Sequence, residues 1–265
     1  MNSINLICQS AYQQFVLGNW AEAAQLAELG LRHDPHHGRL HEVAGVAAYH
    51  QEEYGPAVYH LESASAVVPL RPESQLVLAE LYLRFGQTES ARAILEFLAE
   101  PEGCPIPLLP DLAKVLGRAG AYRAALEVCE RLTTFRPTFH PAWFGVAFYL
   151  KMLGRPISEL ELPLRCAFNL APHALTYRLN LAVVLIDLGQ ITEGYRLIDS
   201  LPPEVVRCPC QCRRFAAACA ALGDHDQAAG FLSQAERLTG KLNDTAESDP
   251  FSQQTDLPRL HDEPS

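Results

Sequence analysis

A turn-forming residue recurs along this chain at an almost constant interval. Glycine occupies six of the seven turn positions and glutamate the second; in order they are Gly18, Glu52, Gly86, Gly120, Gly154, Gly189 and Gly223. The successive spacings are 34, 34, 34, 34, 35 and 34 residues. A fixed period of this size indicates a repeat array, in which each unit buries its apolar face only against its neighbours. The chain is therefore expected to form one elongated domain of stacked units.

Residues 113–137 show one repeat unit most clearly. Apolar residues recur at helical spacing on both sides of Gly120, which predicts two helices separated by a tight turn. Pro137 then prevents the second helix from continuing. Two helices cross closely only where neither carries a bulky side chain, and small residues stand seven positions before every turn. These small residues are Ala11, Gly45, Ala79, Ala113, Ala147, Ala182 and Ala216.

Three features together point to a known repeat family: the period, the small residues, and the aromatic residues two positions after several turns, such as Trp20, Tyr54 and Tyr122. Residues 4–240 resemble the tetratricopeptide repeat (TPR) family. The resemblance implies an all-α fold, a right-handed superhelical solenoid of antiparallel helix pairs. Seven repeats are expected, near residues 4–35, 38–69, 72–103, 106–137, 140–172, 175–206 and 209–240.

Prolines mark two expected departures from the regular pattern. Several prolines lie between residues 101 and 107, so the next helix is expected to begin near Leu109. Pro163 lies inside the second helix of the fifth repeat, where proline removes a backbone hydrogen bond at a cost of about 3 kcal/mol. We therefore expect that helix to be shortened or bent after Leu162. The sixth repeat is expected to recover the regular pattern.

The composition changes after Gly240. Residues 241–265 are rich in acidic and small polar residues, which predicts an acidic disordered tail. The tail carries three large apolar residues that could act as anchors: Phe251, Leu257 and Leu260. Because a repeat array needs a cap at each end, we expect the tail to fold back over that end or into the groove, or two chains to form a homo-oligomer through the solenoid ends.

Charge and hydropathy exclude several classes of partner. The net charge is −10, and basic residues are scattered among acidic ones, so no positive stripe for nucleic acid is expected. The first residues lack the basic start of a signal peptide, and no apolar stretch approaches the length of a membrane span. The eight cysteines do not indicate the disulfide framework of a small secreted domain. We expect a cytoplasmic protein with no membrane insertion.

In TPR proteins the first helices of successive repeats line a concave groove that holds ligand peptides. The resemblance places the groove of this chain on the inward residues of those helices, with apolar and aromatic anchors at both ends and charged residues in the middle. The first four repeats contribute Tyr12, Phe15, Glu42, Val46, Tyr49, Leu76, Glu80, Leu83, Lys114 and Arg118. The fifth and sixth contribute Phe144, Phe148, Lys151, Leu179, Val183 and Ile186.

Two other clusters contain residue types that bind metals. Four thiols lie close in sequence, and thiolates bind zinc when four converge tetrahedrally; they are Cys208, Cys210, Cys212 and Cys219. Their spacing is not that of paired zinc motifs, and Cys212 and Cys219 stand where the repeat needs buried apolar residues. The histidines between His33 and His41 read more simply as a solvated loop. No metal or other cofactor is expected.

Nothing in the sequence assembles a nucleophile, a base and an orienting group, and the repeats leave no room for a catalytic domain. We therefore expect a non-enzymatic interaction protein, a scaffold or adaptor that binds a peptide or helix of another protein in its groove. Two alternatives stay open. One is a secretion- or assembly-type chaperone for a client protein, and the other is a metal- or thiol-regulated sensor that uses the cysteines at 208–219.

Overall fold

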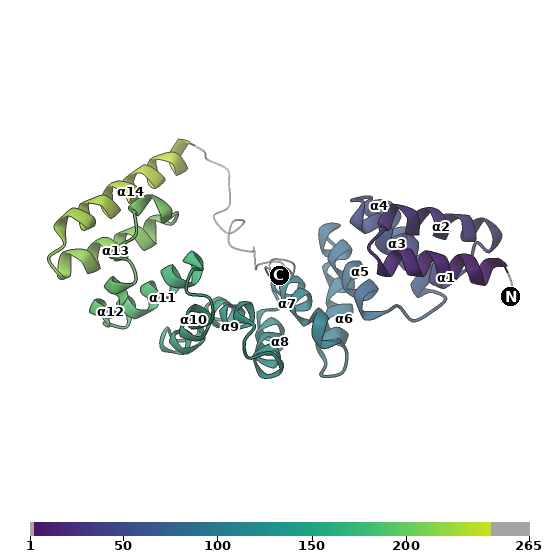
Figure 1. The fold of residues 1–265 in the computed structure, drawn as a ribbon, viewed down its shortest axis with the longest axis horizontal. Coiled ribbons are helices and arrows are strands. Elements are labelled where there is room, and N and C mark those ends of the chain that lie inside the picture. The colour runs from purple at the N-terminus through teal and green to yellow at the C-terminus, as the bar shows by residue number, and fades with distance from the viewer. Residues whose placement is uncertain (1–2, 245–265) are drawn as a thin grey trace. The chain divides into compact units, whose positions relative to one another are not determined.

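The computed structural model describes residues 3–244, and these residues form seven helix pairs with no β-strand among them (Figure 1). The chain divides into two compact units, residues 1–124 and 125–265, which are described separately. Among the described residues, no helix combines the length and apolar character needed to cross a membrane.

Unit 1 contains the first three helix pairs and the first helix of the fourth pair. Its helices are α1 (Ser3–Val16), α2 (Trp20–His33), α3 (Gly38–His50), α4 (Tyr54–Ser65), α5 (Pro72–Arg84), α6 (Thr88–Ala99) and α7 (Leu109–Arg118), with a 3₁₀ turn at Ile106–Leu108. The first helices α1, α3, α5 and α7 pack on one another in sequence order. As expected from the proline-rich loop, α7 begins at Leu109 with Pro110 in its first turn.

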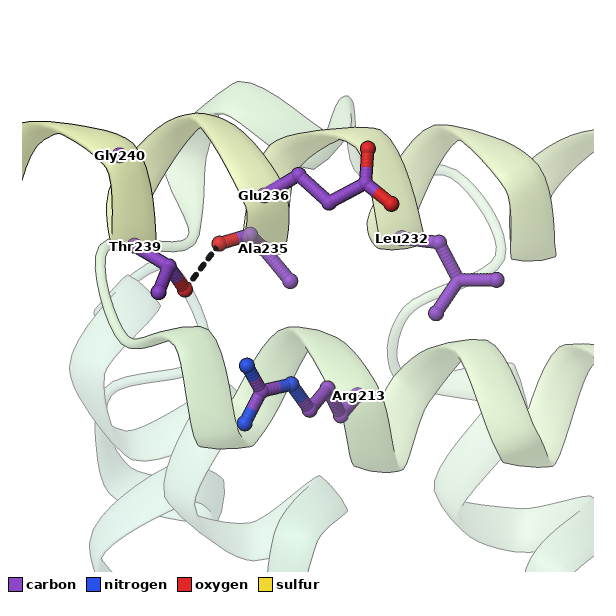
Figure 2. A pocket seen from close by; sticks show the side chains of 6 residues that line it. All are labelled: Arg213, Leu232, Ala235, Glu236, Thr239 and Gly240. Atoms are coloured by element: carbon purple, nitrogen blue, oxygen red, sulfur yellow. Dashed lines mark hydrogen bonds between the residues drawn. The ribbon is translucent and has the colours of Figure 1, made fainter.

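Unit 2 contains the remaining pairs. Helix α8 (Tyr122–Phe135) spans the division, and α9 (His140–Met152), α10 (Ser158–Leu170), α11 (Leu175–Asp187), α12 (Ile191–Arg196), α13 (Pro209–Ala221) and α14 (His225–Asp244) follow, with a 3₁₀ turn at Pro203–Val205. Helices α13 and α14 border a cavity of about 400 Å³ (Figure 2). Helix α14 continues past Gly240 to Asp244. The rest of the acidic segment, with Phe251, Leu257 and Leu260, lies outside the described residues.

The seven predicted turn positions share one backbone conformation. The six glycines have φ between 66° and 82°, and Glu52 has φ of 62°. This left-handed region strains a residue that carries Cβ and is open to glycine. The common conformation explains why glycine recurs at these places. It also makes Glu52 the one turn residue of the seven that is strained.

Replacing Glu52 with glycine is expected to stabilise unit 1 by about 0.5–1 kcal/mol. The substitution removes a left-handed strain of about 1–2 kcal/mol, while the greater freedom of glycine in the unfolded chain offsets part of the gain. Urea unfolding followed by circular dichroism would measure the change. Gly86→Ala is the matched control: its Cβ would meet nothing within 4 Å, so its expected loss of stability is conformational alone. A destabilised Glu52→Gly chain would contradict this account.

The small residues at the helix crossings are buried, as predicted. Ala11, Ala79 and Ala182 are 0% exposed. A Cβ on Gly45 would lie 2.7 Å from Cγ of Leu61, so only glycine allows α3 and α4 to approach this closely. The core of each unit therefore lies along the line where the two helices of a pair cross.

The expectation for Pro163 was wrong in one respect. Helix α10 does not end after Leu162 but runs from Ser158 to Leu170 with Pro163 inside it. Pro163 is buried, so packing retains a helix that loses one backbone hydrogen bond.

The irregular second helix lies in the sixth pair, which was expected to be regular. Helix α12 ends at Arg196, and the chain continues through turns to residue 201. Side chains from other helices satisfy the carbonyl groups that this early end leaves free. Arg178 Nε donates to the Leu197 oxygen at 2.6 Å, and Gln227 Nε2 donates to the carbonyls of Ile198, Asp199 and Leu201. Such partners remove the cost of leaving backbone groups unpaired.

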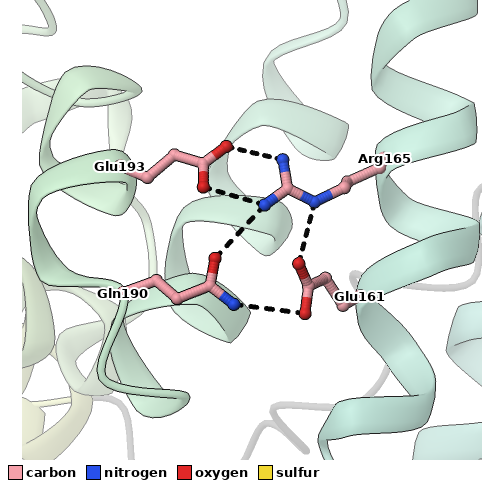
Figure 3. Close-up of polar contacts among 4 residues, drawn as sticks. All are labelled: Glu161, Arg165, Gln190 and Glu193. Carbon is pink, nitrogen blue, oxygen red and sulfur yellow. Dashed lines mark hydrogen bonds and ion pairs between the residues drawn. The ribbon is translucent and has the colours of Figure 1, made fainter.

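A network of ion pairs and hydrogen bonds links the start of α12 to α10 (Figure 3). Arg165 binds both carboxylate oxygens of Glu193, at 2.6 and 2.9 Å, and its Nε donates to Glu161 at 2.9 Å. Gln190 accepts from Arg165 and donates to Glu161. The hydrogen bond from Arg165 lowers the pKa of Glu193 below its ordinary value. Bidentate geometry of this kind orients two helices as well as attracting them.

A histidine pair lies inside unit 1. Buried His41 has Nε2 2.9 Å from the Pro35 carbonyl oxygen and Nδ1 2.9 Å from Nδ1 of His60. A carbonyl oxygen only accepts, so Nε2 of His41 carries a proton; when His41 is neutral its Nδ1 accepts from Nδ1–H of His60. If both rings were fully protonated, two N–H groups would point at each other. The contact therefore requires at least one neutral ring.

Lowering the pH from about 7.5 to about 5.5 is expected to destabilise unit 1. Burial, and then the neighbouring His41, lower the pKa of His60 below its ordinary value, while Glu28 partly opposes this. Below about pH 6.5 the unfolded chain then binds more protons than the folded chain, so stability present above that pH is lost as the pH falls towards the folded-state pKa. Urea midpoints at both pH values measure the effect. His60→Gln should show a smaller pH dependence, and equal dependence in both chains would contradict the assignment.

Candidate partner-binding surface

A cavity of about 290 Å³ opens on unit 1 where three successive first helices meet a turn. Helices α3, α5 and α7 contribute residues to it, and Tyr54 comes from the start of α4. We call it the aromatic–basic pocket, and its lining residues are Tyr49, Tyr54, Glu80, Leu81, Leu83, Arg84 and Arg118. Four of these were predicted as groove residues: Tyr49, Glu80, Leu83 and Arg118. The fold therefore brings together side chains that are up to two repeats apart in sequence.

Two arginines give the aromatic–basic pocket its charge. Nη2 of Arg118 lies 2.8 Å from Oε1 of Glu80, and the Arg118 side chain is 47% exposed. The guanidinium carbon of Arg84 lies 3.8 Å from the ring centroid of Tyr54, a cation–π contact. Both guanidinium groups are thus held in place while remaining accessible. One acidic side chain faces two basic ones.

Tyr49 connects the charged and the aromatic sides of the pocket. Its ring meets that of Tyr54 edge-on, with centroids 6.1 Å apart. Burial, and then the charge and hydrogen bond of Glu80, raise the pKa of Tyr49 well above its ordinary value. The phenol is therefore a hydrogen-bond donor throughout the physiological pH range, and it helps to fix the position of Glu80.

A second aromatic group lies at the first repeat. Tyr12 stacks on Phe15 with centroids 5.9 Å apart, and the guanidinium carbon of Arg71 lies 4.2 Å from the Tyr12 centroid. Tyr12 is 40% exposed, whereas Phe15 packs partly buried between two core clusters. Of these two predicted anchors, Tyr12 is the more accessible.

Four predicted groove residues are buried, so their side chains do not line an open surface. Val46, Leu76 and Leu179 are 3%, 6% and 7% exposed, because they pack in the core of their units. Glu42 is 1% exposed, since its carboxylate turns inward to accept from the Arg71 N–H at the start of α5 and from the Arg39 guanidinium on α3. The Glu42 carboxylate thus joins two parts of unit 1.

The other predicted groove residues are at least partly accessible. Lys114 forms an ion pair with Asp111 at 3.3 Å rather than a free charge. In unit 2, Phe144 packs on Tyr177 with centroids 4.9 Å apart. Half-buried Phe148 and exposed Lys151 lie on the same helix, α9. Half-buried Val183 and Ile186 pack against the core around Phe215. Neither the aromatic–basic pocket nor the cavity between α13 and α14 includes these side chains.

Sequence reasoning missed three pocket residues: Tyr54, Arg84 and Leu81, a core residue of α5. Tyr54 holds the aromatic place two positions after the turn, which serves in the sequence only to identify the repeat. Arg84 directly follows the predicted Leu83, in the last turn of α5. Its guanidinium lies over the ring of Tyr54 at the start of α4. This contact joins two neighbouring helix pairs, so the spacing of residues within one helix does not predict it.

The structure places the four cysteines at 208–219 in different surroundings. Among the described residues, no group of three or more histidine, cysteine, aspartate or glutamate side chains could hold a metal ion. Cys212 and Cys219 are 0% exposed in the core, and burial raises the pKa of each thiol to about 11. Burial opposes ionisation of Cys208 as well, but neighbouring Cys210, backbone N–H groups and Lys151 outweigh it and lower the pKa of Cys208.

Known proteins share the fold with low sequence identity. Residues 72–96 match the family model described as tetratricopeptide repeat, and no curated protein matches the sequence. The C-terminal part of a TPR repeat-containing protein from Cytophaga hutchinsonii gives a TM-score of 0.64 at 14% identity, over 91% of this chain and 100% of that one. A tetratricopeptide repeat protein from Parabacteroides merdae gives 0.54 at 17%, over 89% and 93%. YrrB, described as a TPR protein with an unusual peptide-binding site, gives 0.55 at 15%, over 64% and 88%. The chain therefore has the tetratricopeptide repeat fold that its 34-residue period predicted.

Proposed function

We propose that this chain is a non-enzymatic adaptor that binds a segment of another protein in the aromatic–basic pocket of unit 1. The TPR fold is that of a protein–protein interaction scaffold, and TPR proteins are generally not enzymes. One observation carries the choice of site. Residues of three successive first helices converge on one cavity, and four of its seven lining residues occupy inward positions predicted from the repeat.

The chemistry of the pocket suits a segment with an apolar side chain next to a carboxylate. Tyr49, Tyr54 and Leu83 provide apolar area, and tyrosine and arginine are enriched where interfaces gain most of their energy. Arg84 and Arg118 outnumber Glu80, so an acidic group on the partner gains more than it loses. The exposed guanidinium of Arg118 can exchange its contact with Glu80 for one with the partner.

Affinity purification at native expression level, followed by quantitative mass spectrometry, tests the proposal. The wild-type chain is compared with Arg118→Glu and with Arg92→Glu. Arg92 is an exposed arginine of α6 in an ion pair with Glu89, so its replacement changes the net charge equally, away from the pocket. A partner of the pocket should be lost with Arg118→Glu and kept with Arg92→Glu. If both variants keep every partner while remaining folded, the pocket is not the binding site.

A further inference from the structure

The last helix pair leaves open a face that is buried in every earlier pair. Nine positions after each of the first six turns stands a buried residue; these are Ala27, Leu61, Leu95, Cys129, Pro163 and Ile198. Leu232 occupies the same position of the seventh pair and is 49% exposed. An apolar side chain thus lies in the solvent at a position that the repeat otherwise covers.

The packing of successive pairs explains this difference. In the earlier pairs, the first helix of the next pair packs on the preceding second helix, as in α2 with α3, α4 with α5, α10 with α11 and α12 with α13. Among the described residues no helix follows α14. In its place a cavity of about 400 Å³ lies between α13 and α14, lined by Leu232, Ala235 and Arg213, whose guanidinium points towards the Thr239 side (Figure 2).

We propose that residues 256–260 of the same chain dock in this cavity, with Leu257 and Leu260 covering Leu232. The segment follows α14 closely enough to reach it. Leu232 lies about 18 Å before the end of α14 at a rise of 1.5 Å per residue. Residues 245–256, when extended, span up to about 40 Å.

Charges on the two sides are complementary. The cavity is lined by Arg213 and Glu236, and within the described residues neither forms an ion pair. The segment carries Asp256 and Arg259 on either side of Leu257, so each can face an opposite charge. The tether also favours this occupant over a second copy, because a short linker gives an effective concentration in the millimolar range.

Trypsin cleavage of the full-length protein tests the docking. Arg259 is the sole lysine or arginine in residues 245–265, so cleavage after it releases residues 260–265 and is followed by mass spectrometry. A synthetic peptide of residues 245–265 provides the rate for an undocked segment. Cleavage in the protein is expected to be at least tenfold slower than in the peptide, a factor that corresponds to about 1.4 kcal/mol.

Leu232→Glu should raise the cleavage rate to within about twofold of the peptide rate, since the glutamate removes the apolar contact. Leu162→Glu is the matched control, because Leu162 is 67% exposed on α10 and lies outside the cavity. It should keep the slow rate. Leu257→Ser repeats the test without changing any of the described helices. Cleavage after Arg259 in this variant should approach the rate measured for a peptide with the same substitution.

Two results would overturn the proposal. The first is cleavage of the wild-type protein at the peptide rate. The second is an unchanged slow rate in both Leu232→Glu and Leu257→Ser. Sedimentation velocity on the same samples identifies a second copy as the occupant instead. In that case Leu232→Glu would convert a dimer into a monomer while Arg259 is cleaved at the peptide rate in every sample.

Discussion

Replacing Glu42 with alanine is expected to lower the free energy of unfolding of unit 1 by about 2–3 kcal/mol. Oε1 of Glu42 accepts the backbone N–H of Arg71 at 2.7 Å, and Oε2 accepts from Nη1 of Arg39 at 2.7 Å. The same Nη1 donates to the Pro69 carbonyl at 3.1 Å. A single buried carboxylate thus joins α3 to the segment that begins α5.

The size of this effect follows from which groups lose a partner. Arg71 is the N-cap residue of α5, and its N–H would be left without an acceptor, which costs about 1–3 kcal/mol when buried. The Arg39 side chain is 39% exposed, so water can solvate its charge and the loss stays below that of a fully buried pair. Glu42→Gln keeps an acceptor for the N–H and should lose about half as much.

Tryptophan fluorescence can localise the loss. The chain has two tryptophans, Trp20 in unit 1 and Trp143 in unit 2, so a Trp143→Phe background reports urea unfolding of unit 1 alone. Glu73→Ala, an exposed glutamate in the first turn of α5, is the control and should change stability by less than about 0.5 kcal/mol. A loss below 1 kcal/mol for Glu42→Ala would show that the carboxylate does not hold the two helices together.

The period of the sequence predicts the fold because it depends on local chemistry. The seven turn residues share the left-handed conformation that favours glycine, and the small residues before them are buried where two helices cross. Local signals failed where a tertiary contact decides the outcome. Pro163 remains inside a full-length helix, whereas α12 ends early with its carbonyls bound by Arg178 and Gln227. Neither side chain lies near α12 in sequence.

Only part of the candidate site was predicted, because residues on the same face of a first helix differ in burial with their distance from the turn. Glu42, Leu76 and Leu179 stand ten positions before their turns and are buried. Tyr49 and Leu83 stand three positions before theirs and line the pocket. Helical spacing places both sets on one face, but only the packing of neighbouring pairs shows that the last turns of α3 and α5 line a cavity. The sequence period contains no information on that packing.

Reversing both arginines of the aromatic–basic pocket should have the largest effect on partner binding. The three charged side chains of the pocket, Arg84, Arg118 and Glu80, sum to +1, and Arg84→Glu with Arg118→Glu changes that sum to −3. A partner segment that presents a carboxylate would then meet like charges and lose the cation–π platform on Tyr54. We expect its dissociation constant to rise at least about 100-fold, or about 2.7 kcal/mol, within the range measured when one partner of an interfacial charge pair is removed.

Isothermal titration with the purified partner measures this change. Arg92→Glu with Arg123→Glu is the matched control, since both arginines are exposed in unit 1 outside the pocket and the net charge changes equally. If the control weakens binding as much as the pocket variant, the effect is long-range and depends on salt. A specific site instead predicts that the difference between the two variants persists at high ionic strength, because contacts inside a pocket are screened less than charges on the open surface. The salt dependence of the difference therefore separates a binding pocket from general electrostatic attraction.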